Sequence, residues 1–424
     1  MLEDFLHFTW RTRRFDLKNL ISCQGESIQI QQFGILNTNA GPDFLQAKIQ
    51  IGDTLWAGHV EMHLKSSDWY KHKHETDPAY DNVILHVVFE HDKEVLRSTG
   101  EKIPTLELKN RINKGIEHKY IHLIKNEKKI PCQSQFQEVE SIIKRSVLDK
   151  LLVERLERRT NFIQKELEAN KQDWESTLYS LLAAVFGLKV NKDAFHSLSR
   201  SLPFKVLLKH RDRLHDLEAL LFGQAGLLDK DFEDDYPKQL KKDYFHFKEK
   251  YGLMPVPQSM WKFMRMRPAN FPTIRLAQFA QFIFQTEHIF SKILAAENAV
   301  EIRNLFSVKV AGYWKSHYVF DKASKPAQKR LGSSFVDLII INAVAPFLFV
   351  YSKAKDHHRY LDKAIALLDA TKFEKNTITK QWTEIGLALD SAADSQAALE
   401  LYQCYCLKKK CASCGIGASI LKTI

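Results

Sequence analysis

The periodicity of apolar residues changes part-way along the chain, and this change sets the class of fold open to each half. Up to about Lys109, apolar residues alternate with polar ones or form short β-branched runs, as they do in strands. After about Glu138 they recur every three or four residues, the spacing of helices. We therefore expect an α/β domain over residues 1–130, a linker near 131–137, and a larger all-α domain over 138–424.

The first half has the pattern of a helix, three strands, a short helix and a further strand, an α-β-β-β-α-β order. The run at 82–90 is almost continuously β-branched and aromatic, which is typical of a strand covered on both faces. The expected elements span residues 3–15, 27–33, 44–51, 55–64, 66–74 and 82–90, with 105–108 as one more short strand.

The charge of the chain bears on its partners. Its 424 residues carry a formal net charge of +11, which favours an anionic partner over a cationic one. Nucleic acid is the expected partner, and the alternative is that the basic residues only keep the protein soluble. With 45% hydrophobic residues, 16 Gly and 12 Pro, the composition excludes a collagen-like or wholly disordered chain.

Targeting signals are not expected. Glu3 and Asp4 stand where a signal peptide carries Lys or Arg. The most apolar run, 335–351, contains Asp337 and Pro346, so we expect a buried core helix and no membrane association. Four of the six cysteines lie in the last 21 residues, unlike the even spread of a secreted disulfide framework. A cytoplasmic protein is predicted.

A candidate catalytic pattern lies in the strand region. In the strand predicted at 55–64 and its end, Glu61, His63 and Lys65 occupy alternate positions and therefore share one face. Asp43 opens the preceding strand, so hairpin pairing would place it beside Glu61. Two converging carboxylates suit Mg²⁺ or Mn²⁺, and His63 or Lys65 would stabilise charge on a phosphate or orient the attacking water.

This pattern resembles the PD-(D/E)xK nuclease superfamily over roughly the first quarter of the chain. Pro42-Asp43 matches the PD element, Glu61 matches the second acid, and His63 occupies the position of the motif lysine, with Lys65 two residues further on. The resemblance implies a restriction-endonuclease-like mixed sheet and metal-dependent hydrolysis of nucleic acid. Because the lysine is replaced, the alternatives are a non-catalytic nucleic-acid-binding or scaffold protein that keeps the fold, and a surface hairpin with ordinary salt bridges.

Histidine is concentrated in the same region, where six of the chain's 17 histidines lie within residues 59–91. His72, His74 and His86, with the carboxylates, supply donors for Zn²⁺ or Mn²⁺. His86 lies in a predicted buried strand and needs a partner there, for which Glu61 or Asp43 is expected. The alternatives are a hydrolase of another phosphorylated substrate, and histidines that are structural.

Residues in both halves also resemble an uncharacterised bacterial family that carries only a domain-of-unknown-function label. This resemblance spans most of the chain and implies no activity. The residues that carry it are Gly41 to Phe44, Gly58 to His63, Ser67 to Trp69, His72, His74, Asp77 and Val83 to Val88, and in the second half Arg267 to Pro272 with Arg275, Leu276 and Ala277.

A proline-flanked loop in the helical half is a candidate phosphate site. Prolines 268 and 272 predict an extended loop that leads into a helix, and a helix N-terminus near guanidinium groups suits a phosphate. The candidate residues are Arg265, Arg267, Asn270 and Arg275. The alternative is a structural loop whose arginines cap carbonyls or pair with acids.

The C-terminal cysteines form a candidate metal site. Cys404, Cys406, Cys411 and Cys414 predict a tetrahedral Zn²⁺ site, with an iron–sulfur cluster as the alternative. Helical neighbours two positions apart point to different sides, so Cys132 is an alternative ligand in place of Cys404. Four reduced thiols without metal remain the other interpretation.

Overall fold

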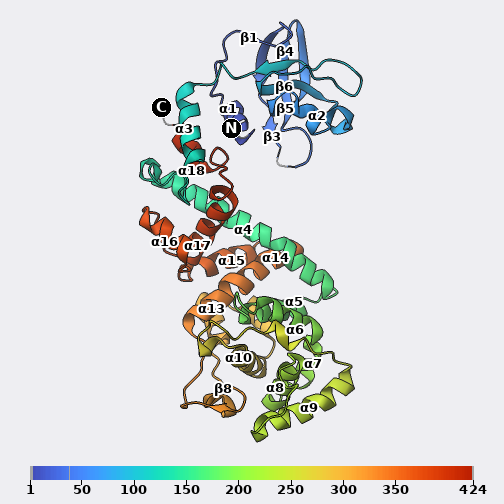
Figure 1. Cartoon of the computed structure of the whole chain (residues 1–424), viewed down its shortest axis with the longest axis vertical. Coiled ribbons are helices and arrows are strands. Elements are labelled where there is room, and N and C mark those ends of the chain that lie inside the picture. The colour runs from blue at the N-terminus through green and yellow to red at the C-terminus, as the bar shows by residue number, and fades with distance from the viewer. Residues whose placement is uncertain (1–2, 38, 423–424) are drawn as a thin grey trace. The chain divides into compact units, whose positions relative to one another are not determined.

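The computed structural model describes residues 3–37 and 39–422, which belong to two compact units (Figure 1). The first unit comprises Met1–Leu151, Lys380–Leu387 and Ala398–Ile424, and the second comprises Leu152–Thr379 and Ala388–Ala397.

The first unit extends past the linker expected at 131–137, as far as Leu151. It also includes the cysteine-rich tail, which was expected to belong to the all-α domain. In that unit helix α18 (Gly415–Lys422) packs against α3 (Lys114–Lys125). Helical periodicity predicts that a helix has a buried face, but it does not specify which distant element covers that face.

The first unit is built on a mixed sheet, as the sequence predicted. Strands β1 to β5 pair antiparallel, whereas β6 and β7 run parallel to β5. The strands stand in the order β1 (Leu20–Ile21), β2 (Ser27–Gln32), β4 (Phe44–Ile51), β5 (Thr54–Lys65), β6 (Val83–Glu90) and β7 (Thr105–Glu107), with β3 (Ile35–Leu36) also on β4. The two-residue strands β1 and β3 are too short to show a period and were not predicted.

The centre of the sheet explains two local sequence features. Strand β6 lies between β5 and β7, and six of its eight residues are buried, which accounts for its continuous apolar run. On β5, a Cβ at Gly58 would lie 2.4 Å from Ile84 Cγ2 and 2.6 Å from the Asn82 carbonyl oxygen. Glycine therefore permits the close approach of β5 to the start of β6.

The connection from β5 to β6 is short and irregular. The helix expected at 66–74 is reduced to α2 (Asp68–Lys71), because Lys73 adopts the left-handed conformation with φ of 61°. Two 3₁₀ turns follow, η1 (His74–Thr76) and η2 (Pro78–Tyr80). Helix α1 (Glu3–Arg11) packs against β5, and its Phe5 ring stacks on Tyr120 of α3 with centroids 4.3 Å apart.

Helix α4 (Ser141–Ala169) begins in the first unit and ends in the second, which is helical apart from the short pair β8 (His317–Val319) and β9 (Lys322–Ala323). The helices from the second unit onward are α5 (Trp174–Phe186), α6 (Lys192–Ser201), α7 (Phe204–Lys209), α8 (Leu214–Gln224), α9 (Asp235–Tyr251), α10 (Pro272–Gln285), α11 (Ile289–Ala295), α12 (Ala299–Leu305), α13 (Ser333–Ile339), α14 (Ala345–Lys355), α15 (Arg359–Asp369), α16 (Thr377–Glu384) and α17 (Ala392–Glu400).

The most apolar helix lies in the core of the second unit. Among the described residues, Ser333–Lys355 is the one segment long and apolar enough to cross a membrane, and 72% of its apolar window is buried. A π-helical turn, η7 (Ile340–Val344), precedes Pro346, which has no backbone N–H to donate. Arg159 donates to the Ile341 carbonyl oxygen at 2.9 Å, which stabilises this irregular turn. The burial agrees with the predicted core helix.

Candidate metal centre

The two predicted carboxylates lie next to each other across strands β4 and β5. The backbone amide of Asp43 donates to Glu61 Oε2 at 3.0 Å, and the amide of Met62 donates to Asp43 Oδ2 at 3.0 Å. The pairing of Phe44 with Val60 sets this arrangement. The structure thus brings Asp43 beside Glu61, as the hairpin pattern predicted.

The second oxygen of Glu61 faces imidazoles. Glu61 Oε1 lies 3.5 Å from His63 Nε2 and 3.4 Å from His74 Nε2. His63 Nε2 also lies 3.0 Å from His72 Nδ1. Glu61 Oε1 therefore lies beside nitrogens of His63 and His74, and His72 joins the group through its contact with His63.

These separations match those of ligands around a single ion. The ligand atoms of His63, His72 and His74 all lie within 4.8 Å of one another. Nitrogen ligands bound at about 2.0–2.1 Å in tetrahedral geometry lie about 3.3 Å apart, close to the separations observed here. Three imidazoles and one carboxylate suit Zn²⁺ or Mn²⁺ better than Mg²⁺, which prefers oxygen ligands.

The irregular connection after β5 positions two of the three histidines. His72 ends α2 and His74 begins η1, with the left-handed Lys73 between them. The His74 ring is stacked on Tyr80 with centroids 3.7 Å apart and meets Trp69 edge-on at 5.3 Å. His63 and His74 are buried, whereas His72 is exposed, so the site reaches solvent on the His72 side.

His86 supports the site from the neighbouring strand. Its Nε2 lies 2.8 Å from His63 Nδ1, so its partner is His63 rather than Glu61 or Asp43, the partners expected from the sequence. The parallel register puts His86 opposite Glu61 in the backbone, but the side chain meets the ring two positions along β5. His86 is therefore placed to orient His63 rather than to share its ligand position.

Burial keeps two of these imidazoles neutral. It lowers the pKa of His63 to about 2 and that of His86 to about 3, and the neighbouring histidines add to both effects. A neutral imidazole has a lone pair available for a metal. Burial also raises the pKa of Glu61, and the charge of Asp43 adds to this effect, so a cation nearby would stabilise its ionised form.

The sequence did not point to His7, which the structure adds to the site. It projects from α1, and its Nε2 lies 3.1 Å from Asp43 Oδ2. Burial lowers the pKa of His7, but the contact with Asp43 and the charges of Glu3 and Glu61 outweigh it and raise the net pKa. Lys65, the other predicted cation, is exposed at the end of β5. No local sequence pattern indicates His7, because its contact with Asp43 depends on how α1 packs on the sheet.

Two of the four candidate phosphate-binding residues, Asn270 and Arg275, make hydrogen bonds within the protein. Residues 268–270 form a 3₁₀ turn rather than an extended loop. Arg275 is buried over the Phe335 ring and donates to Asn270 Oδ1 at 2.7 Å and to Gln278 Oε1 at 3.0 Å. Arg265 and Arg267 are exposed. These contacts give Asn270 and Arg275 a structural role, and phosphate binding at this loop stays a prediction.

The tail cysteines do not share one environment. Cys406, Cys411 and Cys414 are buried, whereas Cys404 is partly exposed and its Sγ donates to Glu400 Oε1 at 3.0 Å.

Comparison with known proteins identifies the family. Residues 3–377 match the family described as a protein of unknown function, DUF2851. The chain belongs to this family. No curated protein and no solved structure matches the chain. The DUF2851 match covers the sheet, the three histidines and most of the helical unit, which confirms the predicted membership of an uncharacterised family.

Proposed function

We propose that this DUF2851 protein is a metal-dependent phosphoesterase, with nucleic acid as its first candidate substrate. The observation that carries the proposal is the cluster of His63, His72 and His74, whose ligand atoms lie within 4.8 Å of one another, with Glu61 Oε1 beside His63 and His74. An ion such as Zn²⁺ or Mn²⁺ held there would lower the pKa of a bound water and polarise a phosphoryl oxygen.

The roles of the individual residues follow from their surroundings. His63, His72, His74 and Glu61 would hold the ion, and His86 would orient His63 through its nitrogen 2.8 Å away. Asp43 would fix the Glu61 carboxylate rather than bind the ion, because Asp43 Oδ2 already accepts from Met62 and contacts His7. The sequence had suggested a two-carboxylate site for Mg²⁺ or Mn²⁺, and the present proposal instead gives the ion three imidazoles and one carboxylate.

His7 would supply the positive charge that the motif lysine provides in PD-(D/E)xK nucleases. Its raised pKa favours the charged form, and the pair that it makes with Asp43 lies beside Glu61. A cation at this position would stabilise charge that develops on a phosphate. The net charge of +11 favours an anionic polymer as substrate.

The test combines metal binding with cleavage. Full-length protein stripped of metal is titrated with Zn²⁺, Mn²⁺ and Mg²⁺, and then assayed on labelled DNA, labelled RNA and bis-p-nitrophenyl phosphate. We expect cleavage with Zn²⁺ or Mn²⁺ that falls by at least about 100-fold in Glu61→Gln. The control is Glu90→Gln, since Glu90 lies at the end of β6 and pairs with Lys109.

The outcomes separate the alternatives. Cleavage of bis-p-nitrophenyl phosphate without cleavage of nucleic acid would indicate another phosphorylated substrate. Metal binding and salt-dependent nucleic-acid binding without any cleavage would indicate a non-catalytic binding protein.

A further inference from the structure

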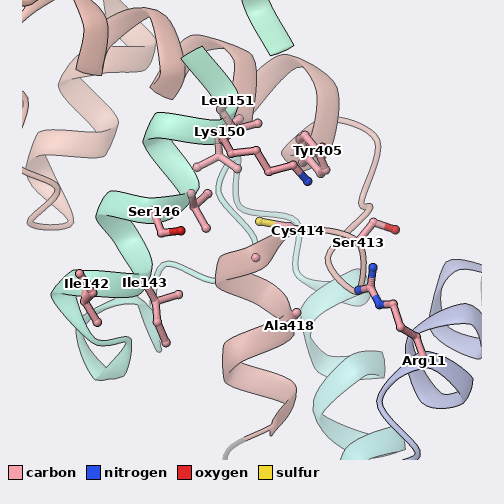
Figure 2. A pocket seen from close by; sticks show the side chains of 13 residues that line it. Arg11, Ile142, Ile143, Ser146, Lys150, Leu151, Tyr405, Ser413, Cys414 and Ala418 are labelled. Atoms are coloured by element: carbon pink, nitrogen blue, oxygen red, sulfur yellow. The ribbon is translucent and has the colours of Figure 1, made fainter. Parts of the chain in front are cut away.

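A pocket of about 500 Å³ opens in the first unit, between the first turns of α4 and the C-terminal segment (Figure 2). Its volume lies within the range of roughly 300–1,000 Å³ that small-molecule sites occupy. The residues that line it come from the end of α1, from residues 142–151 of α4 and from the segment 401–418, all in the first unit. None of them belongs to the histidine cluster, so the pocket is a separate candidate site.

The helices that form the pocket leave it open because small residues face α4. On α4, Ile143, Val147 and Leu151 recur every four positions and therefore share the face that lines the pocket. The facing helix α18 contributes Gly415 and Ala418. A Cβ at Gly415 would lie 2.4 Å from Val147 Cγ2, so the two helices touch there, while the methyl group of Ala418 fills little of the space one turn further on.

The apolar part of the lining is aliphatic. Leu151 and Leu401 are buried, and Ile143 and Val147 are half-buried. Tyr405 supplies the one aromatic ring among the residues that line the pocket. Branched aliphatic side chains of this kind favour an aliphatic ligand, since burying methylene groups against them removes apolar surface from water.

The polar part of the lining carries positive charge. Arg11 and Lys150 line the pocket, and none of the lining residues is acidic. In Figure 2 the Arg11 side chain extends toward Ser413, and the Lys150 side chain extends toward Tyr405, so each cation has a hydroxyl group on its side of the pocket. An apolar lining with cations and hydroxyl groups at its edge is complementary to a ligand with an apolar body and an anionic head group.

The placement of the two cations favours a carboxylate head group. A carboxylate carries one charge and can accept two hydrogen bonds from a single guanidinium group. A phosphate monoester carries a charge of about −1.5 to −2 at pH 7 and needs more donors. Because Arg11 and Lys150 extend toward different parts of the wall, they do not form one doubly charged position.

We propose that this pocket binds an aliphatic carboxylate such as a medium-chain fatty acid. The carboxylate would pair with Arg11, and the chain would lie along Ile143, Val147 and Leu401. This binding is independent of the histidine site and of the proposed hydrolysis.

The test is isothermal titration of the full-length protein with decanoate, octanoate, decanol and acetate. A chelator is present, so that no metal at the histidine site binds the carboxylate. We expect one decanoate per chain, with an affinity about 10-fold higher than that of octanoate, because each of the two additional methylene groups contributes about fourfold. Decanol lacks the charge and acetate lacks the chain, so both should bind at least about 10-fold more weakly than decanoate.

Variants locate the ligand in the pocket. Arg11→Gln should lower the affinity for decanoate by about 10-fold and leave that for decanol unchanged, since only the charged hydrogen bond is lost. The matched control is Arg13→Gln, an exposed arginine outside the pocket that lies over the Phe33 ring and should affect neither ligand. Ser146→Trp, at an exposed position of α4 that lines the pocket, should fill it and weaken both ligands by at least about 10-fold.

Four results would overturn the proposal. Absence of saturable decanoate binding contradicts it directly, and decanoate that binds no more tightly than decanol means that the head group is not recognised. Equal losses in Arg11→Gln and Arg13→Gln would show a general attraction to positive charge. Undiminished affinity in Ser146→Trp would place decanoate outside the pocket. Circular dichroism checks the folding of each variant, and Ser146→Leu replaces Ser146→Trp if the larger side chain prevents folding.

Discussion

Asp43 and Glu61 hold each other in place across β4 and β5, with the Asp43 amide donating to the Glu61 carboxylate at 3.0 Å. The Asp43 carboxylate in turn accepts from the amide of Met62, the residue after Glu61. This reciprocal arrangement leaves Glu61 Oε1 turned toward the imidazoles. In the proposed metal site, this arrangement would make Asp43 a positioning residue and Glu61 a ligand.

The two acids should therefore respond differently to substitution. Asp43→Asn keeps an oxygen that accepts from Met62, so we expect Zn²⁺ affinity to fall about tenfold, the usual cost of disturbing a residue behind the ligands. Glu61→Gln removes a ligand charge and should lower affinity by more than about 100-fold. Isothermal titration of metal-free protein measures both, and equal losses would instead support a site in which both carboxylates bind the ion.

His72→Ala offers a test that does not disturb the core. His72 is exposed, so its removal should leave the melting temperature of the metal-free protein unchanged within about 2 °C. Zn²⁺ affinity should fall by about 100-fold, since one of three imidazole ligands is lost. The matched control is His118→Ala, an exposed histidine on α3, and a similar effect in both variants would contradict the assignment.

His7→Gln separates metal binding from turnover. Because His7 contacts Asp43 and not the three ligand histidines, we expect Zn²⁺ affinity to change by less than about threefold. Cleavage of bis-p-nitrophenyl phosphate should fall by about 10- to 100-fold in kcat, since a positive charge near the phosphate is lost. Unchanged kcat would remove His7 from the proposed machinery.

Glu218 gives the helical unit a pH-dependent stability. It is buried on α8, Tyr236 donates to it at 2.5 Å, and burial raises its pKa to about 7. Between about pH 4.5 and pH 7, Glu218 therefore holds a proton in the folded state that it releases in the unfolded state. The stability that comes from protonated Glu218 is complete below about pH 4.5 and is lost as the pH rises to about 7.

The measurement compares variants across this range. Between pH 5 and pH 8, the wild type should lose free energy of unfolding, on the order of 2 kcal/mol, relative to Glu218→Gln, which keeps an acceptor for Tyr236. Glu249→Gln changes an exposed residue of α9, so its free energy of unfolding should differ from that of the wild type by the same amount at every pH in this range. If the difference in free energy of unfolding between wild type and Glu218→Gln does not vary with pH, the pKa of Glu218 is not raised in the folded protein.

Gly58→Ala tests the strand contact beneath the site. The added methyl group would meet Ile84 and Asn82 at distances that no relaxed structure tolerates, so unfolding by denaturant should show a loss of about 1–3 kcal/mol. A Cβ at Gly332 has no heavy atom within 4 Å, and Gly332→Ala should be neutral within about 0.5 kcal/mol. Equal stabilities of the two variants would show that β5 and β6 can separate there without cost.

The strands that carry the site were predictable because their signals are local. The alternation of Val60, Met62 and Leu64 with Glu61, His63 and Lys65 reflects the two faces of a strand, and the β-branched run at 82–90 reflects a strand buried on both faces. The neighbourhood of Asp43 and Glu61 also followed from the sequence, since consecutive strands joined by a short turn pair with each other. The concentration of histidines indicated a transition-metal site, but the sequence did not show which histidine nitrogens lie next to one another.

Only the tertiary structure decided which side chains share a site. His86 contacts His63 because β6 lies parallel to β5, a register set by the irregular connection between them. His7 reaches Asp43 through the packing of α1, and the C-terminal tail joins the first unit through the packing of α18 on α3. The physical reason is that periodicity along a chain determines which face of an element is buried, whereas the partner of that face depends on packing between segments that are distant in sequence.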